Sequence, residues 1–219
     1  MIAKNICKNT LAPLKPTDTG IFALRQMSDN HVRHLPVTDG DMFVGLLSED
    51  DVLHSNPELN VELYRYAMAR PFAFESDHLY EVMHKMGLYK LTVIPVLDEM
   101  EHYCGCITLE DLLPAFTEAS YLNEKGNILV LESAPHGFSL SEIARIVESE
   151  HAQILSYFVT TPSDNATVEI TLKLNKTEIG SIVAALQRFD YEVKGTYSES
   201  DYAEDMSDRY EAFMSYLNV

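Results

Sequence analysis

The sequence contains the same short pattern twice, and this repeat constrains the fold more than any single residue does. In the first copy an apolar-Pro-Val strand precedes residues 45–53, and in the second copy an equivalent strand precedes residues 105–113. From glycine through hydroxyl residue to aspartate, the two copies are 60 positions apart. Because one unit of this size buries too little apolar surface alone, we expect the two copies to pack on each other as one module.

Both copies have the same predicted element order: helix, strand, turn, strand, helix. Thr17 and Ser76 are the predicted N-caps of the first helices, each followed by apolar residues at helical spacing. A further helix is predicted to open at Ser48. The predicted strands cover residues 35–37 and 43–47 in the first copy, and residues 93–96 and 103–107 in the second.

A hydroxyl residue three positions before an aspartate closes each copy of the pattern, as Ser48 with Asp51 and as Thr108 with Asp111. At a strand-to-helix junction this pair is typical of a capping box, in which the hydroxyl satisfies a free amide. The same geometry also suits a ligand, since the hydroxyl can donate to a phosphate and the carboxylate can accept two hydrogen bonds from a ribose diol. Both interpretations stay open at this point, although the double occurrence favours the second.

The conjunction of these motifs resembles a tandem pair of CBS domains over residues 1–116, a module that usually senses adenosine compounds. The resemblance implies that the aspartates bind ribose and that the hydroxyls bind phosphate or ribose. It also implies that residues 14–18, residues 72–77 and the Pro-Val strands line the adenine pockets. The residues assigned in this way are Ser48, Asp51, Thr108, Asp111, Pro36, Pro95, Thr17, Asp18, Ser76 and Asp77.

Arg33 is the cation of interest in the first copy, because it lies three residues before Pro36. CBS domains often keep a phosphate-binding base at this place, so the resemblance adds Arg33 to the ligand-binding set. The second copy has Thr92 there instead. A single arginine on such a loop is otherwise most often solvated, which is the alternative interpretation.

Residues 126–198 have a different periodicity and predict the order β-α-β-β-α-β of the ferredoxin-like motif. Capping boxes are predicted at Ser139 with Glu142 and at Asn175 with Glu178. Following a CBS pair, this region resembles an ACT domain. The predicted division is therefore residues 1–58 and 59–120 for the repeats, 126–198 for the ACT-like domain, and 200–219 for an acidic helix that docks or dimerises.

The loop over residues 132–139 is where ACT domains usually hold an amino acid. Ser133 occupies the place of the expected acid or amide, and His136 separates the proline from the glycine. Amino-acid binding is thus disfavoured, and dimerisation through side-by-side sheets is the preferred interpretation, because exposed sheet edges seek pairing.

Composition excludes several classes of function. The formal net charge is −18 without a dense Lys/Arg patch, which argues against nucleic acid as a partner. Short apolar stretches and the lack of a signal-peptide pattern argue against a membrane protein, and three cysteines suit a reducing compartment. Neither a metal-ligand spacing nor a catalytic constellation stands out. We therefore expect a cytoplasmic binding protein, not an enzyme.

A CBS pair followed by an ACT-like domain resembles the acetoin-utilisation accessory proteins of bacteria. The expected fold is mixed α and β, with a pseudo-symmetric CBS module and a ferredoxin-like domain. The expected function is that of a homodimeric regulator without a required cofactor. It would bind AMP, ADP, ATP, S-adenosylmethionine or NAD between the repeats and act on an unidentified effector protein. The alternative is an oligomeric scaffold with an empty, degenerate CBS pair, and an enzyme is a third and weaker hypothesis.

Overall fold

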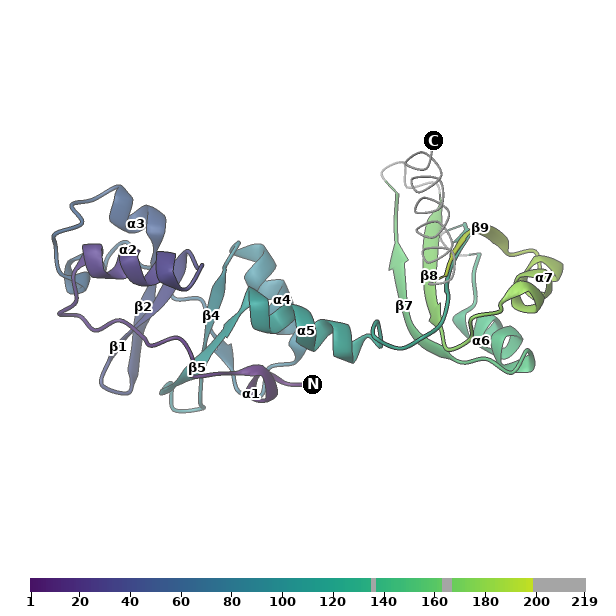
Figure 1. The fold of residues 1–219 in the computed structure, drawn as a ribbon, viewed down its shortest axis with the longest axis horizontal. Coiled ribbons are helices and arrows are strands. Elements are labelled where there is room, and N and C mark those ends of the chain that lie inside the picture. The colour runs from purple at the N-terminus through teal and green to yellow at the C-terminus, as the bar shows by residue number, and fades with distance from the viewer. Residues whose placement is uncertain (135–136, 163–166, 199–219) are drawn as a thin grey trace, which may run out of the picture. The chain divides into compact units, whose positions relative to one another are not determined.

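The computed structural model describes residues 1–134, 137–162 and 167–198 (Figure 1). The chain divides into two compact units, Met1–Phe116 and Thr117–Val219. The predicted acidic helix at 200–219 lies outside the described residues.

The first unit contains the two predicted repeats in the predicted order. The first repeat consists of α2 (Gly20–Asp29), β1 (His34–Asp39), β2 (Met42–Ser48) and α3 (Glu49–Leu53). A 3-10 turn, η1 (Val61–Tyr64), connects it to the second repeat. The second repeat consists of β3 (Ala73–Phe74), α4 (Leu79–Leu88), β4 (Val93–Leu97), β5 (Tyr103–Thr108) and α5 (Leu109–Ala119).

The strand register shows that the two repeats are structural equivalents. Pro36 of β1 pairs with Leu46 of β2, and Pro95 of β4 pairs with Cys106 of β5. Both hairpins are antiparallel, and each has a register shift directly after the Pro-Val dipeptide. The repeat seen in the sequence therefore extends to the backbone irregularity of each hairpin.

The N-caps of α2 and α4 lie two residues later in the structure than the sequence predicts. The N-cap of α2 is Thr19, whose side chain accepts a hydrogen bond from the amide of Phe22, so Thr17 is not the cap. The N-cap of α4 is His78 instead of Ser76. In both repeats an aspartate closes the preceding turn by accepting a hydrogen bond from a backbone amide, which delays the start of the helix.

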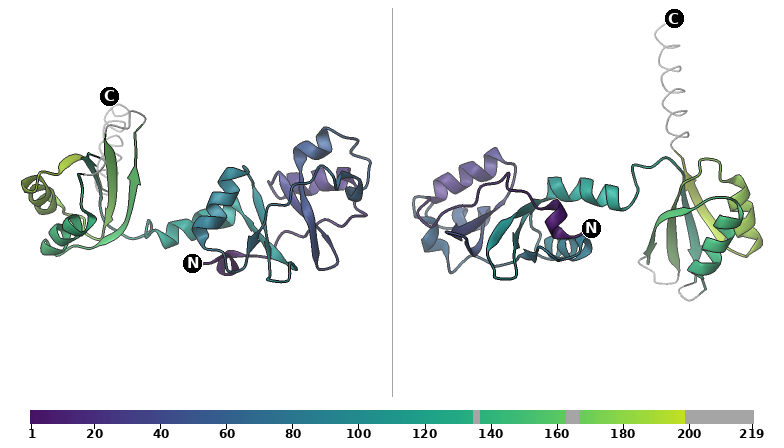
Figure 2. Two further views of the ribbon diagram at one scale, coloured as in Figure 1. Left: turned by 180° about the vertical axis from the view of Figure 1, so that it is seen from behind. Right: turned by 90° about the horizontal axis from the view of Figure 1, so that it is seen from below.

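The N-terminal segment packs on the second repeat although it precedes the first in sequence (Figures 1 and 2). Helix α1 (Ala3–Ile6) contributes Ala3 and Ile6 to the core cluster that contains α4, β4 and β5. Amides of Ala3 and Lys4 donate to the carbonyls of Asp77 and Glu75. Residues 1–8 thus pack on the core of the second repeat and bridge to β5 at Lys8, and this placement brings the Lys8 side chain to the motif.

The second unit has the predicted β-α-β-β-α-β order. The strands β7, β8, β6 and β9 form, in this spatial order, one antiparallel sheet, and the two helices cover one face of it (Figures 1 and 2). The bounds are β6 (Ile128–Ser133), α6 (Leu140–Ser149), β7 (Ile154–Thr160), β8 (Val168–Leu174), α7 (Gly180–Arg188) and β9 (Glu192–Tyr197).

The two capping boxes predicted for this unit are only partly present. Ser139 caps α6, but the carboxylate of Glu142 accepts a hydrogen bond from the Tyr191 hydroxyl at 2.8 Å. Helix α7 begins at Gly180, so the predicted box starting at Asn175 is wrong. The Asn175 side chain instead accepts from the amide of Gln153 at 2.8 Å, because a tertiary contact between two loops competes with the local cap.

Candidate functional site

The repeated hydroxyl–aspartate pairs both form capping boxes. The Ser48 hydroxyl donates to Asp51 Oδ2 at 2.6 Å, and the Asp51 amide donates back to the hydroxyl oxygen at 3.1 Å. Thr108 and Asp111 repeat these two contacts at 2.7 and 3.1 Å. The structural interpretation of the motif therefore holds in both copies, and any ligand must use the atoms that the boxes leave over.

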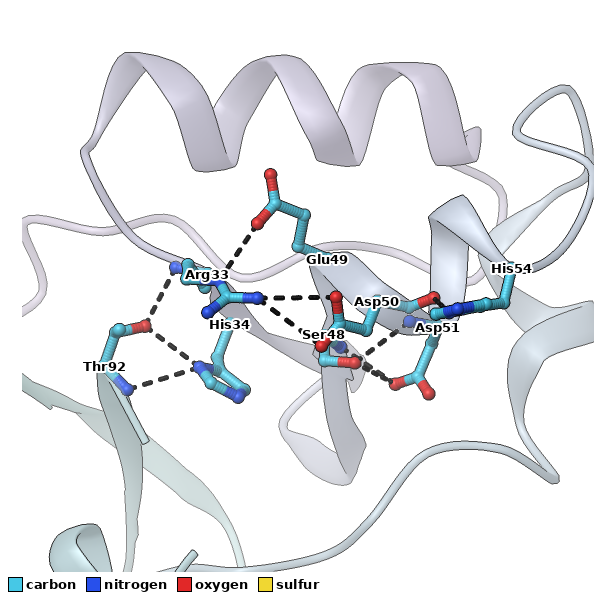
Figure 3. A network of polar contacts seen from close by, with 8 residues as sticks. All are labelled: Arg33, His34, Ser48, Glu49, Asp50, Asp51, His54 and Thr92. Carbon is cyan, nitrogen blue, oxygen red and sulfur yellow. Dashed lines mark hydrogen bonds and ion pairs between the residues drawn. The ribbon is translucent and has the colours of Figure 1, made fainter. Parts of the chain in front are cut away.

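A hollow of about 280 Å³ lies beside the first motif and is walled by both repeats. Arg33, His34, Ser48 and Asp50 come from the first repeat, and Tyr89 and Lys90 come from the end of α4 in the second. In Figure 3, Ser48 lies between Arg33 and Asp51. The lining thus brings the Arg33 cation next to the Ser48 hydroxyl, which donates to the Asp51 carboxylate outside the lining.

Two carboxylates hold Arg33 in place. Its Nε is 3.0 Å from Glu49 Oε2, and its Nη2 is 3.4 Å from Asp50 Oδ1 (Figure 3). All three side chains are substantially exposed, so these ion pairs are weak and the arginine can exchange partners. Lys90 provides a second cation at the same hollow, and we find no hydrogen bond or ion pair to it from the described side chains.

The two repeats are joined beside this hollow by one polar junction. The Arg33 amide donates to the Thr92 hydroxyl at 2.9 Å, while the Thr92 amide donates to His34 Nδ1 at 3.2 Å (Figure 3). The Thr92 hydroxyl is also 3.0 Å from His34 Nδ1. Burial, reinforced by the charge of Arg33, lowers the pKa of His34. A neutral ring with its proton on Nε2 fits these contacts, since Nδ1 must accept.

The second motif has an equivalent but smaller hollow of about 130 Å³. Its walls also come from both repeats: Thr108 and Asp111 belong to the second, and Thr10, Leu11, Asn30 and Val32 to the first. Lys8 Nζ lies 2.5 Å from Asp111 Oδ1. Burial pushes the pKa of Asp111 up, but hydrogen bonds from Lys8 and Thr108 outweigh it, and the pKa is lowered.

Seven predicted ligand residues do not line these two hollows. Asp51 is one of them, since it is held in its capping box by Ser48. Pro36 and Pro95 are buried within β1 and β4. Thr17 is exposed, and Asp18 accepts a hydrogen bond from the Lys15 amide. Asp77 is held by Lys85 at 2.6 Å, and Ser76 lines a separate hollow of about 390 Å³ together with Lys4 and Asp98.

The lining residues that the sequence analysis missed include Thr10, Leu11 and Tyr89. It also missed the cation Lys8, which pairs with Asp111 of the second hollow. None of them is part of the repeated motif, so the repeat alone could not indicate them. Lys90 follows α4 and also lines the first hollow.

The cysteines and acidic groups do not form a further centre in the described part of the chain. Burial raises the pKa of Cys7 to about 12 and that of Cys106 to about 11, so neither thiol ionises at neutral pH. Among the described residues, no group of three His, Cys, Asp or Glu side chains is arranged to hold a metal ion. Nor does any helix there have the length and apolarity needed to cross a membrane.

Comparison with known proteins identifies the repeated unit. Residues 3–58 and 66–118 match the family model of the CBS domain. Similar solved structures include a CBS domain pair/ACT domain protein from Thermotoga maritima, at 22% identity and TM-score 0.49 over 54% of this chain and 98% of that one. A candidate acetoin utilization protein (AcuB) from Vibrio cholerae is 20% identical, with TM-score 0.48 over 56% and 95%. CBSX2, solved in complex with AMP, is 20% identical, with TM-score 0.46 over 53% and 96%.

Proposed function

Because this chain carries a tandem pair of CBS domains, we propose that it is a regulatory protein that binds an adenosine-containing ligand between its two repeats. AMP, ADP, ATP, S-adenosylmethionine and NAD share the ribose diol and the adenine that such a site would recognise. No catalytic step and no required cofactor belong to this proposal.

The observation that supports it is that each motif brings a hydroxyl, a carboxylate and a cation together beside a hollow between the repeats. In the first site Arg33 and Ser48 line the hollow, and Asp51 accepts a hydrogen bond from Ser48 without lining the hollow itself (Figure 3). A ribose diol would donate to the carboxylate, and a phosphate would accept from the hydroxyl and the arginine. Carboxylate, hydroxyl and cation would then meet ribose and phosphate in the order in which a nucleotide presents them.

Regulation would follow from the walls of the two hollows, since both repeats contribute to each of them. A ligand that fits one relative pose of the repeats better than another shifts the population toward that pose. Thr92 joins the repeats beside the first hollow, so a change in their relative pose would alter its hydrogen bonds with Arg33 and His34.

We further propose that the second unit is an ACT-like domain that pairs two copies of the chain. Strand β7 is at one edge of its sheet, and Tyr157 and Val159 on this strand are 48% and 44% exposed. An edge strand with exposed apolar residues is a surface that seeks a partner strand. The output would pass to an effector protein, and acetoin utilisation is the first process in which to look for one.

The test is ligand binding by the full chain, measured by thermal unfolding and calorimetry. Ligand at 100 times its dissociation constant adds about 2.7 kcal/mol, which should raise the midpoint by roughly 5–10 °C. Asp51→Asn combined with Asp111→Asn preserves the shape of both capping boxes and should weaken binding at least about tenfold, because a charged acceptor is lost at each ribose.

Asp29→Asn is the matched control, since Asp29 is exposed and pairs with Arg25 on its own helix α2. It should bind as the unchanged protein does. Undiminished binding by the double variant would contradict the assignment of the two aspartates.

The second candidate function is the scaffold with an empty CBS pair. It is favoured by the second site, where the hollow is small and Lys8 already occupies the carboxylate. Under this hypothesis none of the adenosine ligands shifts the unfolding midpoint, and the purified protein carries no nucleotide absorbance. A defined oligomer would remain in both cases, so oligomeric state does not discriminate between them.

A further inference from the structure

The second strand of each hairpin receives an isolated strand-like contact at the same position, and the residues that make it correspond to each other. Lys8 and Cys106 exchange both backbone hydrogen bonds at 3.0 Å. In the other repeat Ala69 pairs with Leu46, the counterpart of Cys106. Lys8 and Ala69 are therefore equivalent positions, and only one of them has a charged side chain.

The side chain of Lys8 contacts the carboxylate oxygen of Asp111 that the capping box does not use. Asp111 Oδ2 accepts from Thr108, as part of the capping box, and Asp111 Oδ1 accepts from Lys8 Nζ at 2.5 Å. In the first site Asp51 Oδ2 takes the same capping contacts. No described side chain forms a hydrogen bond or ion pair with Asp51 Oδ1, whereas Asp111 Oδ1 already accepts from Lys8.

The two sites also obtain their cations from different places. The first uses Arg33, which directly precedes β1, whereas the corresponding position before β4 is Thr92. Lys8 is 103 residues from Asp111 in sequence and reaches it from the N-terminal segment. Its side chain is 55% exposed, against 13% for Asp111, so the ammonium can move while the carboxylate stays fixed.

From this arrangement we propose that Lys8 makes the second site selective for phosphorylated adenosine ligands over adenosine itself. The inference rests on the proposed ligand-binding function and specifies the ligand class of one of its two sites.

The selectivity depends on which acceptors the Lys8 ammonium has before and after the ligand binds. A ribose diol that donates both of its hydrogen bonds to Asp111 Oδ1 competes with Lys8 for this oxygen. With a neutral nucleoside the displaced ammonium returns to water and the ion pair is lost. With a phosphorylated ligand the phosphate offers the ammonium a new anionic acceptor, so the exchange is nearly balanced.

The experiment measures the affinities of AMP and adenosine by calorimetry in the full chain with Asp51→Asn, which leaves the second site as the reporter. Adding Lys8→Met keeps the aliphatic stem and removes the charge. We expect adenosine to bind more tightly and AMP more weakly, so that the ratio of the two affinities falls about tenfold. Lys8→Arg should preserve the ratio.

Lys4→Met is the matched control, because Lys4 lies on the same segment and pairs with Glu75 away from the motif. It should leave the ratio unchanged. If both ligands bind and Lys8→Met alters them equally or not at all, the selectivity role is wrong while the proposed function stands. If only the chain with intact Asp51 binds, the second site is not a ligand site and the inference fails alone. If the unaltered chain binds neither ligand, both proposals fail.

Discussion

The backbone amide of Arg33 donates to the hydroxyl of Thr92 at 2.9 Å, and these two residues occupy corresponding positions before the first hairpin strand of their repeats. This hydrogen bond between the repeats therefore involves a position that is arginine in the first copy and threonine in the second. If both residues were arginine, two cations would meet at this junction, whereas a threonine supplies the acceptor that the Arg33 amide needs.

Replacing Thr92 with valine should destabilise the CBS pair by about 1 kcal/mol, because the Arg33 amide loses its acceptor and His34 loses a partner. Thermal unfolding should show a midpoint lower by roughly 2–4 °C. Thr160→Val, at an exposed position of β7, is the control and should leave the first unit unaffected. A wild-type midpoint for Thr92→Val would mean that water replaces the hydroxyl without cost.

The CBS pair should lose stability as the pH falls below about 6.5, the ordinary pKa of histidine. The folded-state pKa of His34 is lowered, so over this interval the unfolded chain takes up a proton that the folded protein does not, and unfolding is favoured. Above this pH both states carry the neutral ring and the effect vanishes. The measurement is chemical unfolding from pH 7.5 to 5.5, with His34→Gln expected to flatten the decline.

Gly105→Ala should be strongly destabilising, by about 2–4 kcal/mol. Gly105 has φ +146°, and an added Cβ would lie 2.7 Å from Cys7 Sγ and 2.8 Å from the Lys8 carbonyl oxygen. The substitution would therefore push the N-terminal segment off β5. The comparison is Gly87→Ala in α4, where a Cβ meets nothing within 4 Å and helix propensity predicts a gain of about 0.5–1 kcal/mol. Equal effects of both on the urea midpoint would contradict this account.

The buried thiols should resist alkylation in the folded protein. Burial raises the pKa of Cys7 to about 12 and of Cys106 to about 11, so at pH 8 less than a hundredth of either is thiolate. Iodoacetamide followed by mass spectrometry should label both at least about tenfold more slowly in the folded than in the urea-unfolded protein. Labelling of Cys7 at the unfolded rate would show that the segment carrying Lys8 detaches readily.

Local patterns predicted the hairpins and helices well, because alternation and helical spacing depend on residues close in sequence. The strand pairs of both repeats and the β-α-β-β-α-β order of the second unit are confirmed. The helix starts were less predictable. Asp18 and Asp77 each close a turn that displaces the cap by two residues, and Asn175 prefers a contact with Gln153 to a cap on α7.

The sequence by itself determined the repeat, its element order and the two hydroxyl–aspartate capping boxes, since each of these depends on neighbours within one turn or one hairpin. Only the tertiary structure decided which residues wall the two hollows and which cation serves each one. Lys8 reaches Asp111 because residues 1–8 pair with the second repeat, and Arg33 meets Thr92 because the repeats pack against each other. Contacts of this kind join residues 59 and 103 positions apart, and no periodicity in the chain encodes them.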